Sequence, residues 1–447
     1  MKHLISFISK LLLILWCLAP MTAYAGPKAD LEEAHTRLLA ARACLAIYSD
    51  RTGTLSREYL KQEGWEIQPY IQAGDIDDAR FLVAKRETGN DGQPLYLLAI
   101  VGTETLKNVK TNLTMDQVYF AGHTPEEFAA NASLRRLPDS VPKVHHGFYK
   151  YVETAFKAKA PTKDNSNPRL LSELLLENKD RKVYLTGHSL GGATATLAGA
   201  RLLSMGVKPE QIEVLTFGAP AVGNQAFAEK FAPSLHVTRV VIDGDPITGI
   251  LQTVAGYKQF GQEIRWTSHD VTQKGNHAMV GYLDAAIKDY YDKRHKAQQD
   301  GLIELPMQKV TTGGVARTYI SPARNLLPEG LRPEFEYMQQ ILWDEYRRVL
   351  PDYILADPAA DVVTREQAAV QGCSWLIVPE LSAHKLKTDP NTYYVTLQQM
   401  VYDTATGNLV NMSSFSTSTD NLTPLEALIH DVRGTNAETG KLLKKPE

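Results

Sequence analysis

Apolar residues recur at helical spacing near the start of the chain and again near residue 280. Over residues 31–50 they fall every three or four positions, which predicts an amphipathic helix. Short apolar, β-branched runs then alternate with helical patterns. The strand-like runs are 81–84, 95–101, 182–186, 213–217 and 238–242; the helical ones are 148–157, 170–176, 193–205, 225–231 and 279–296. This alternation predicts an α/β fold, a mostly parallel sheet covered by helices.

The pattern changes after residue 297. Periodicity is lost over 298–316, where glycine and proline recur, and this stretch is predicted to be a linker. Residues 317–447 then show a helix opened by Pro333, a short strand at 375–378 and a hairpin over 393–415. A last helix begins at a capping box formed by Thr423 and Glu426, with Pro424 at its first position. We therefore expect an α/β domain over 26–297 and a small α+β accessory domain over 317–447.

The first 25 residues form a separate segment. A basic start with Lys2 and Lys10 is followed by a short apolar run and by the small-residue sequence AYA before Gly26. This pattern is typical of a signal peptide cleaved after Ala25, and the run is short for a membrane anchor. We expect an exported protein, periplasmic or extracellular. The sequence leaves open whether the remaining cysteines, Cys44 and Cys373, pair.

Length, composition and charge suit a two-domain globular protein that does not bind nucleic acid. The length of 447 residues suits two domains, and an apolar content of 43% is enough for a large core. The net charge is −3, and no basic stripe predicts contact with nucleic acid.

The sequence KVYLTGHSLGG carries the clearest chemical signal. Residues 187–191 fit the G-x-S-x-G pattern, with a predicted strand before them and a predicted helix after them. In that context the hydroxyl of Ser189 points away from the sheet, beside a helix N-terminus that favours developing negative charge. The alternative is a glycine-rich turn with a bystander serine. The strand and helix on either side favour a nucleophile.

A serine nucleophile needs a base and an acid that orients the base. In α/β-hydrolases the acid and then the histidine follow the serine along the chain. Asp243 and Asp245 both follow the strand predicted at 238–242, and we favour Asp245. The later histidines of the domain are His269, His277 and His295. We favour His277, which opens the last helix, over His269.

Several motifs, in order, point to one family. They are VGTETLKNVKTNL at 101–113, VHHGF at 144–148, GHSLGGA at 187–193, TFGAPAVGNQAF at 216–227 and DPI at 245–247. With these motifs, residues 31–296 resemble the class 3 lipases, the fungal-lipase-like branch of the α/β-hydrolases. The C-terminal domain lies outside this resemblance.

The resemblance implies roles for particular residues. Ser189 is the nucleophile, His277 the base and Asp245 the acid that orients it. The oxyanion hole is formed by the backbone N–H groups of Thr103 and Leu190. No metal or organic cofactor is implied.

One departure from the family bears on the substrate. The lid-like segment 106–112 carries only two large apolar residues, Leu106 and Val109, and no tryptophan. A lid that docks on lipid needs an apolar face. The weak lid argues against strong activation at a lipid interface and suits a phospholipase A1.

These observations predict an exported serine ester hydrolase that cleaves lipid-like acyl esters through an acyl-enzyme, with transient contact at a lipid interface. The alternatives are a phospholipase A1, a short-chain esterase, or a catalytically inactive envelope binding or scaffold protein. All triad candidates precede the linker, so we expect the C-terminal domain to dock an unknown partner. A chain ended near Gln299 should then keep its ester hydrolysis.

Overall fold

The computed structural model describes most of the chain beyond the predicted signal peptide. The described residues are 26–72, 79–87, 94–101, 116–157, 159–160, 169–267, 275–310, 318–361, 363–389 and 391–443. The predicted signal peptide, the lid-like segment, Thr103 and His269 lie outside them.

A mostly parallel sheet forms the first unit. Among the described residues it has seven strands in the order β1-β2-β3-β8-β9-β10-β11. Their bounds are β1 Glu66–Gln72, β2 Ala79–Glu87, β3 Pro94–Ile100, β8 Lys182–His188, β9 Ile212–Phe217, β10 His236–Ile242 and β11 Gln262–Trp266. The pairs from β3 to β11 are parallel, and β2 pairs antiparallel with both β1 and β3. The predicted α/β-hydrolase class is confirmed.

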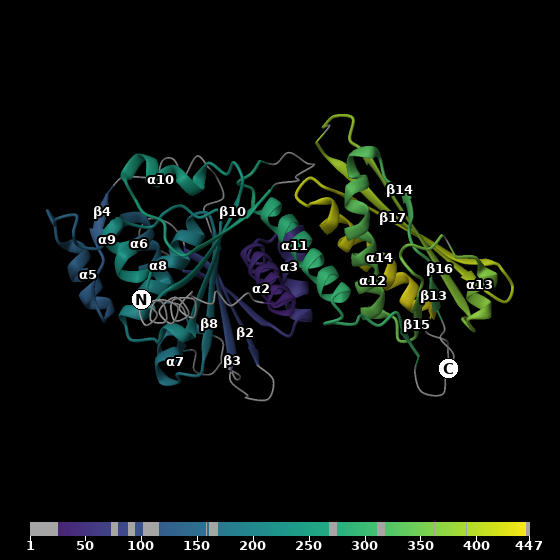
Figure 1. Ribbon diagram of the computed structural model, residues 1–447, viewed down its shortest axis with the longest axis horizontal. Coiled ribbons are helices and arrows are strands. Elements are labelled where there is room, and N and C mark those ends of the chain that lie inside the picture. The colour runs from purple at the N-terminus through teal and green to yellow at the C-terminus, as the bar shows by residue number, and fades with distance from the viewer. Residues whose placement is uncertain are drawn as a thin grey trace, which may run out of the picture.

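Helices cover both faces of this sheet (Figure 1). Helices α6 His146–Ala155 and α8 Leu190–Ser204 pack on one face, and α2 Pro27–Leu45 and α11 Met279–Gln299 pack on the other. The other helices described in this unit are α3 Arg51–Gln62, α5 Pro125–Ser133, α7 Leu171–Glu177, the 3-10 helix η1 Pro209–Gln211, α9 Gln225–Phe231 and α10 Ile247–Ala255. Two short strand pairs, β4 Gln117–Tyr119 with β5 Lys143–His145 and β6 Lys159–Ala160 with β7 Arg169–Leu170, lie apart from the sheet.

The first predicted helix ends earlier than expected, and a second helix follows it. Helix α2 ends at Leu45, and α3 begins at Arg51 behind Asp50, whose carboxylate accepts a hydrogen bond from the Gly53 N–H at 2.8 Å. Asp50 is therefore an N-cap, a role that its short acidic side chain suits. The predicted helix over 31–50 is present as α2, but its end was placed five residues too late, because apolar spacing alone does not locate a helix end.

The second unit is built on a mixed sheet. Its order among the described residues is β12-β15-β13-β16-β17-β18, with β14 paired to β16. The bounds are β12 Gln308–Lys309, β13 Thr318–Ile320, β14 Arg324–Leu326, β15 Tyr353–Leu355, β16 Trp375–Lys385, β17 Tyr393–Asp403 and β18 Leu409–Ser418. Its helical segments are η2 Glu329–Glu334, α12 Phe335–Val349, α13 Arg365–Val370 and α14 Pro424–Leu443. The predicted α+β character of this unit is confirmed.

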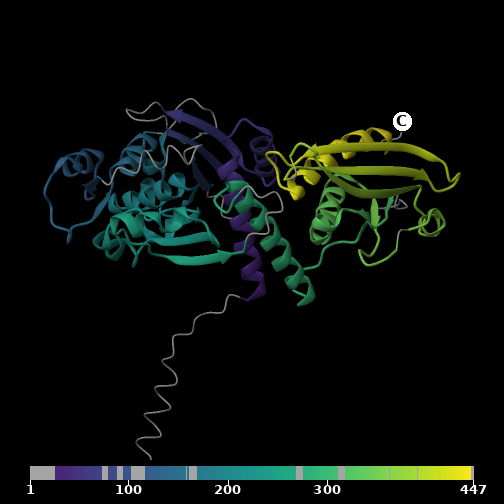
Figure 2. The ribbon, with the colours of Figure 1, turned by 90° about the horizontal axis from the view of Figure 1, so that it is seen from above.

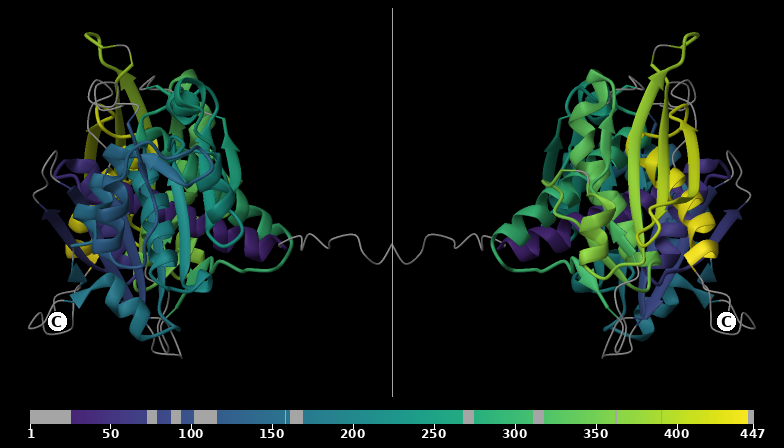
Figure 3. Two further views of the ribbon diagram at one scale, coloured as in Figure 1. Left: turned by 90° about the vertical axis from the view of Figure 1, so that its left-hand side faces the viewer. Right: turned by 90° about the vertical axis from the view of Figure 1, so that its right-hand side faces the viewer.

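Two details refine the predicted layout of the chain. Strand β12 lies inside the stretch predicted as a linker and pairs with β15 of the second sheet. Pro333 lies in η2, and α12 begins two residues later at Phe335. In Figure 1, α12 and α14 lie on the side of the second sheet that faces the first unit, and α13 lies at its far end; Figure 3 shows the molecule from its two ends.

One hydrophobic core continues from the first unit into the second. Helices α2 and α11 lie between the two sheets together with α12 and α14 (Figures 1 and 2). A single cluster of buried side chains joins Phe217 of the first sheet, Ile287 of α11, Leu342 of α12 and Leu428 of α14. The two units are therefore packed against each other as one body rather than joined only through the linker.

Buried ion pairs cross the same interface. The Arg42 guanidinium of α2 donates to the Glu426 carboxylate of α14 at 2.8 Å, and the two residues are 1% and 0% exposed. Lys288 of α11 donates to Glu334 of η2, also at 2.8 Å. A buried charge without its partner costs several kcal/mol, so these pairs hold the units in register.

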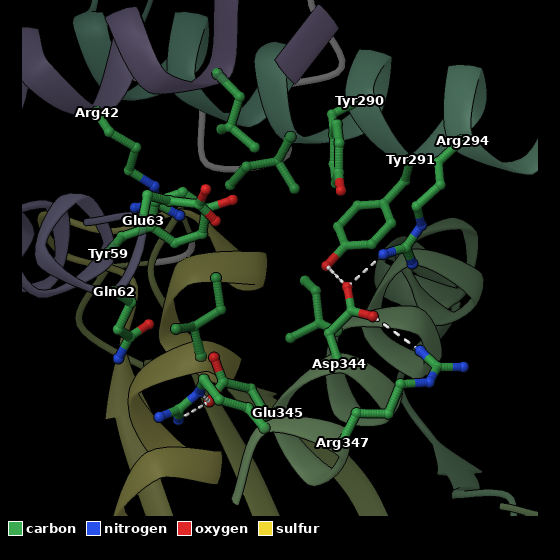
Figure 4. A pocket seen from close by; sticks show the side chains of 15 residues that line it. Arg42, Tyr59, Gln62, Glu63, Tyr290, Tyr291, Arg294, Asp344, Glu345 and Arg347 are labelled. Carbon is green, nitrogen blue, oxygen red and sulfur yellow. Dashed lines mark hydrogen bonds and ion pairs between the residues drawn. The ribbon is translucent and has the colours of Figure 1, made fainter. Parts of the chain in front are cut away.

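A cavity of about 410 Å³ also opens between the units (Figure 4). Asp344 of α12 lies in its wall and accepts hydrogen bonds from Tyr291, Arg294 and Arg347. These contacts extend the polar part of the interface.

The predicted capping box at the start of α14 is only half formed. The Thr423 hydroxyl accepts a hydrogen bond from the Glu426 N–H at 3.3 Å, but the Glu426 carboxylate pairs with Arg42 instead of closing the box. Leaving the buried guanidinium of Arg42 without a counter-charge would cost more free energy than leaving the helix end without a second capping hydrogen bond.

The two cysteines whose pairing the sequence left open are both free and buried. The thiol of Cys44 lies 3.5 Å from the Thr186 hydroxyl, within the first unit.

The shared core predicts that a chain ended at Gln299 does not fold stably. Truncation would expose Leu38, Leu45 and Ile287, and each such side chain contributes about 1.5–3 kcal/mol when buried. We expect an aggregated product or a strongly lowered urea midpoint, measured by soluble yield and by circular dichroism. A soluble fragment with the midpoint of the full chain would contradict the shared core and restore the expectation that the first unit works alone.

The interface also predicts a pH dependence of stability. Burial raises the pKa of Glu426 from 4.5 to about 6, although Arg42 pulls it down. Because the folded-state pKa is the higher one, the protonated side chain favours the folded state. Its contribution, about 2 kcal/mol, is complete below pH 4.5 and is lost as the pH rises through about 6.

The side chain introduced by Glu426→Gln cannot ionise, so the stability of this variant should not follow the titration. Between pH 4.5 and about 6, the unfolding free energy of wild type should fall by about 2 kcal/mol relative to that of the variant. Urea titrations at several pH values measure the difference. Glu229→Gln, at an exposed glutamate, is the control and should follow wild type throughout. A constant difference between wild type and Glu426→Gln would contradict the buried, protonatable carboxyl.

Candidate active site

Ser189 occupies a sharp turn between β8 and α8. Its φ of 56° and ψ of −125° lie in a region that residues other than glycine rarely adopt. A Cβ on Gly187 would lie 2.3 Å from the Gly191 carbonyl carbon, and a Cβ on Gly192 would lie 2.7 Å from Ala219 Cβ. Only glycine fits at these two positions, so the glycines of the motif permit the strained turn.

His277 lies immediately before α11, between the serine and an acid. Its Nε2 is 3.0 Å from Ser189 Oγ, and its Nδ1 is 2.9 Å from each carboxylate oxygen of Asp245. Ser189 is 2% exposed, Asp245 6%, and the His277 side chain 11%. The structure thus brings together the three residues favoured for the triad, in a continuous chain of hydrogen bonds largely shielded from solvent.

Asp245 follows β10 and is held by two further donors. The Ile247 N–H donates to Oδ1 at 2.9 Å, and the Tyr282 hydroxyl donates to Oδ2 at 2.6 Å. The Tyr282 oxygen in turn accepts from the Ile242 N–H at 3.1 Å. These bonds fix the plane of the carboxylate that faces His277.

Tyr282 is a residue that the sequence analysis missed. Burial, and then the negative charge of Asp245, raise the pKa of Tyr282 far above its usual range, so the hydroxyl remains a donor. Its position in the first turns of α11, five residues after His277, is the signal that could have suggested it.

The other candidates lie elsewhere or outside the described residues. The Asp243 carboxylate is exposed and pairs with Arg265 at 3.3 Å. His295, near the far end of α11, contacts Gln299. His269 lies outside the described residues.

Of the two residues expected to form the oxyanion hole, only Leu190 is described. It is the first residue of α8, where backbone N–H groups have no acceptor within the helix and the helix dipole favours negative charge. Thr103 lies outside the described residues. Nearby, His145 Nδ1 accepts from the Gly147 N–H at 3.1 Å, which caps α6 and gives this histidine a structural role.

In the described part of the chain, no group of three or more His, Cys, Asp or Glu side chains is arranged to hold a metal ion. None of the helices described has the length and apolar composition needed to cross a bilayer.

Residues 97–254 match the family model described as lipase (class 3). The first unit is therefore similar to class 3 lipases, as predicted. The matched stretch contains Ser189 and Asp245 and ends before His277, so the role expected of His277 in this class 3 lipase-like unit rests on geometry alone.

Curated relatives include lipases and a toxin. The chain is 27% identical over 175 residues to Toxin TseL of Vibrio cholerae, covering 39% of this chain and 23% of that protein. It is 27% identical over 201 residues to the secreted mono- and diacylglycerol lipase 2 of Gibberella zeae, covering 40% and 45%. It is 29% identical over 131 residues to phospholipase A1-II 1 of Oryza sativa, covering 28% and 33%. The chain thus spans less than half the length of each of these relatives.

Tyr282→Phe tests the support around the acid. The change leaves Asp245 Oδ2 without one donor and the buried Ile242 N–H without its acceptor. We expect the unfolding free energy to fall by about 1–3 kcal/mol, measured by urea titration. Tyr337→Phe is the matched control, since its hydroxyl bonds Asp292 at the surface and its loss should change stability by less than about 0.5 kcal/mol. Equal effects of the two changes would contradict the role given to Tyr282.

Proposed function

We propose that the protein is an exported serine ester hydrolase that cleaves lipid-like acyl esters. The observation that carries the proposal is the hydrogen-bonded chain from Asp245 through His277 to Ser189. A serine hydroxyl is a weak nucleophile until a base accepts its proton, and this arrangement supplies the base and its orienting acid.

The geometry supports a two-step reaction through an acyl-enzyme. Ser189 Oγ attacks the ester carbonyl carbon while His277 Nε2 takes the hydroxyl proton. The tetrahedral oxyanion is held by the Leu190 N–H and, we propose, by the N–H of Thr103. His277 then protonates the leaving alcohol, and an acyl-enzyme remains on Ser189. Water, deprotonated by His277, releases the carboxylic acid and restores the serine.

The substrate class rests on the family. The class 3 lipase match and a relative that is named a mono- and diacylglycerol lipase favour acylglycerols. A phospholipase A1 is the second candidate, favoured by the relative of that name and by the few apolar residues at 106–112. A short-chain esterase would use the same triad.

Export is the second part of the proposal. The signal-peptide pattern at residues 1–25 and a relative named as secreted both support a periplasmic or extracellular enzyme. We propose that the second unit, whose outer sheet face lies away from the first unit, also docks a partner.

The rival function is an inactive binding or scaffold protein. Fluorophosphonate probes distinguish the two, because they react with activated serines. We expect labelling of wild type and none of Ser189→Ala. His277→Ala should label at least about a hundredfold more slowly. His295→Ala, at the exposed end of α11, should label like wild type.

Two other labelling results would contradict parts of the proposal. Labelling of His277→Ala at the wild-type rate would contradict the assigned base and point to His269. An unlabelled but folded wild type would contradict an enzymatic role and favour the scaffold.

A substrate panel then tests the class of ester. The panel contains nitrophenyl esters of short and long acids, a monoacylglycerol emulsion and phosphatidylcholine vesicles. We expect release of long-chain acid from the acylglycerol. Cleavage of only the short soluble esters would contradict lipid-like substrates, and preferred release from phosphatidylcholine would favour the phospholipase.

A further inference from the structure

His188 precedes the serine and touches the base in two ways. Its Nε2 lies 2.8 Å from the carbonyl oxygen of His277, and the centroids of the two imidazole rings are 4.6 Å apart. On another side, the ring centroid of Tyr282 lies 5.8 Å away. One side chain at the end of β8 therefore contacts both the backbone and the ring of the proposed base.

The carbonyl contact determines where the proton of His188 resides. A carbonyl oxygen only accepts, so Nε2 must carry the hydrogen. Burial, and then the neighbouring His277 ring, lower the pKa of His188 to about 3, although the hydrogen bond to the His277 carbonyl and then the charge of Asp245 act in the opposite direction. The titratable groups that face it are His277, Asp245 and Tyr282. His188 is thus a neutral imidazole with its hydrogen on Nε2 and none on Nδ1.

The segment that carries His277 needs such a contact. It is a short turn before α11, closed by the Ala278 N–H donating to the Gly275 carbonyl at 3.0 Å. On the acid side, the Asn276 amide donates to the Asp243 carbonyl at 2.7 Å. On the nucleophile side, His188 holds the His277 carbonyl. The turn is thereby tied to both loops with which its imidazole must align.

We infer that His188 is a positioning residue, which donates from Nε2 to the His277 carbonyl and so sets the distance between the base and Ser189. The inference rests on the proposed function. Proton transfer requires close alignment, and a displacement of about 1 Å can slow an enzyme a hundredfold. The neutral state matters as well, because a second positive charge 4.6 Å from His277 would disfavour the imidazolium formed during acylation.

Two substitutions test this role. His188→Phe keeps a flat ring and removes the donor, whereas His188→Gln places an amide nitrogen near the original Nε2. Active sites are first counted with a fluorophosphonate, and kcat and KM are then measured on a nitrophenyl ester. We expect His188→Phe to lose about 10- to 100-fold in kcat per active site with KM within about twofold. His188→Gln should recover most of the loss.

His123→Phe is the matched control. Its Nδ1 also contacts a backbone carbonyl, that of Ser204 at 2.7 Å, but it lies on the surface. It should retain the wild-type kcat. A merely structural role for His188 would lower the unfolding midpoint and leave kcat per active site unchanged. Such a result would overturn the inference.

A spectroscopic measurement on wild type does not depend on the variants folding. ¹⁵N NMR of labelled histidines should show His188 neutral with its hydrogen on Nε2 from about pH 5 to 8. The Nδ1–H form, or titration near the ordinary value of about 6.5, would overturn the inference. A wild type without ester hydrolysis would instead contradict the proposed function, while the NMR result would still decide the contact.

Discussion

The site depends on one chain of hydrogen bonds, from Asp245 through His277 to Ser189. Its members come from the end of β10, the start of α11 and the turn after β8, which meet only when the parallel sheet has formed. Because parallel strands end at the same edge, two of the three residues are placed by the sheet itself. The third residue, His277, is placed by the packing of α11. The alignment of the hydrogen bonds therefore depends on how firmly α11 is held.

Helix α11 is fixed from both sides. Its buried face packs on the sheet and α2, and its outer side meets α12 and η2 of the second unit, where Lys288 pairs with Glu334. Tyr282, in the first turns of the same helix, holds Asp245. The second unit therefore supports the helix that follows His277, the proposed base. The sequence suggested independent units because loss of periodicity marks a linker, whereas the contacts of the shared core join residues far apart in the chain.

Local signals were enough to predict much of the fold and the site. Apolar runs, glycines at fixed spacing and the order of serine, acid and histidine are all short-range patterns, and they located β8, α8 and the residues of the proposed triad. Strand β1 was missed because Pro69 and its polar neighbours hide the alternation of an edge strand. The pairing of Arg42 with Glu426 could not be predicted from the sequence, since the two residues are 384 positions apart. In the sequence, each resembles an ordinary surface charge. Tyr282 was missed for the same reason, because its acceptor, Asp245, is set by tertiary packing.

The proposed mechanism places a covalent acyl group on Ser189 during turnover. The direct measurement is mass spectrometry of protein quenched during hydrolysis of a long-chain nitrophenyl ester, followed by peptide mapping. We expect the peptide containing Ser189 to gain the mass of the acyl group and to lose it as the substrate is exhausted. Sustained hydrolysis with no acylated peptide, or with the acyl group on another residue, would contradict it.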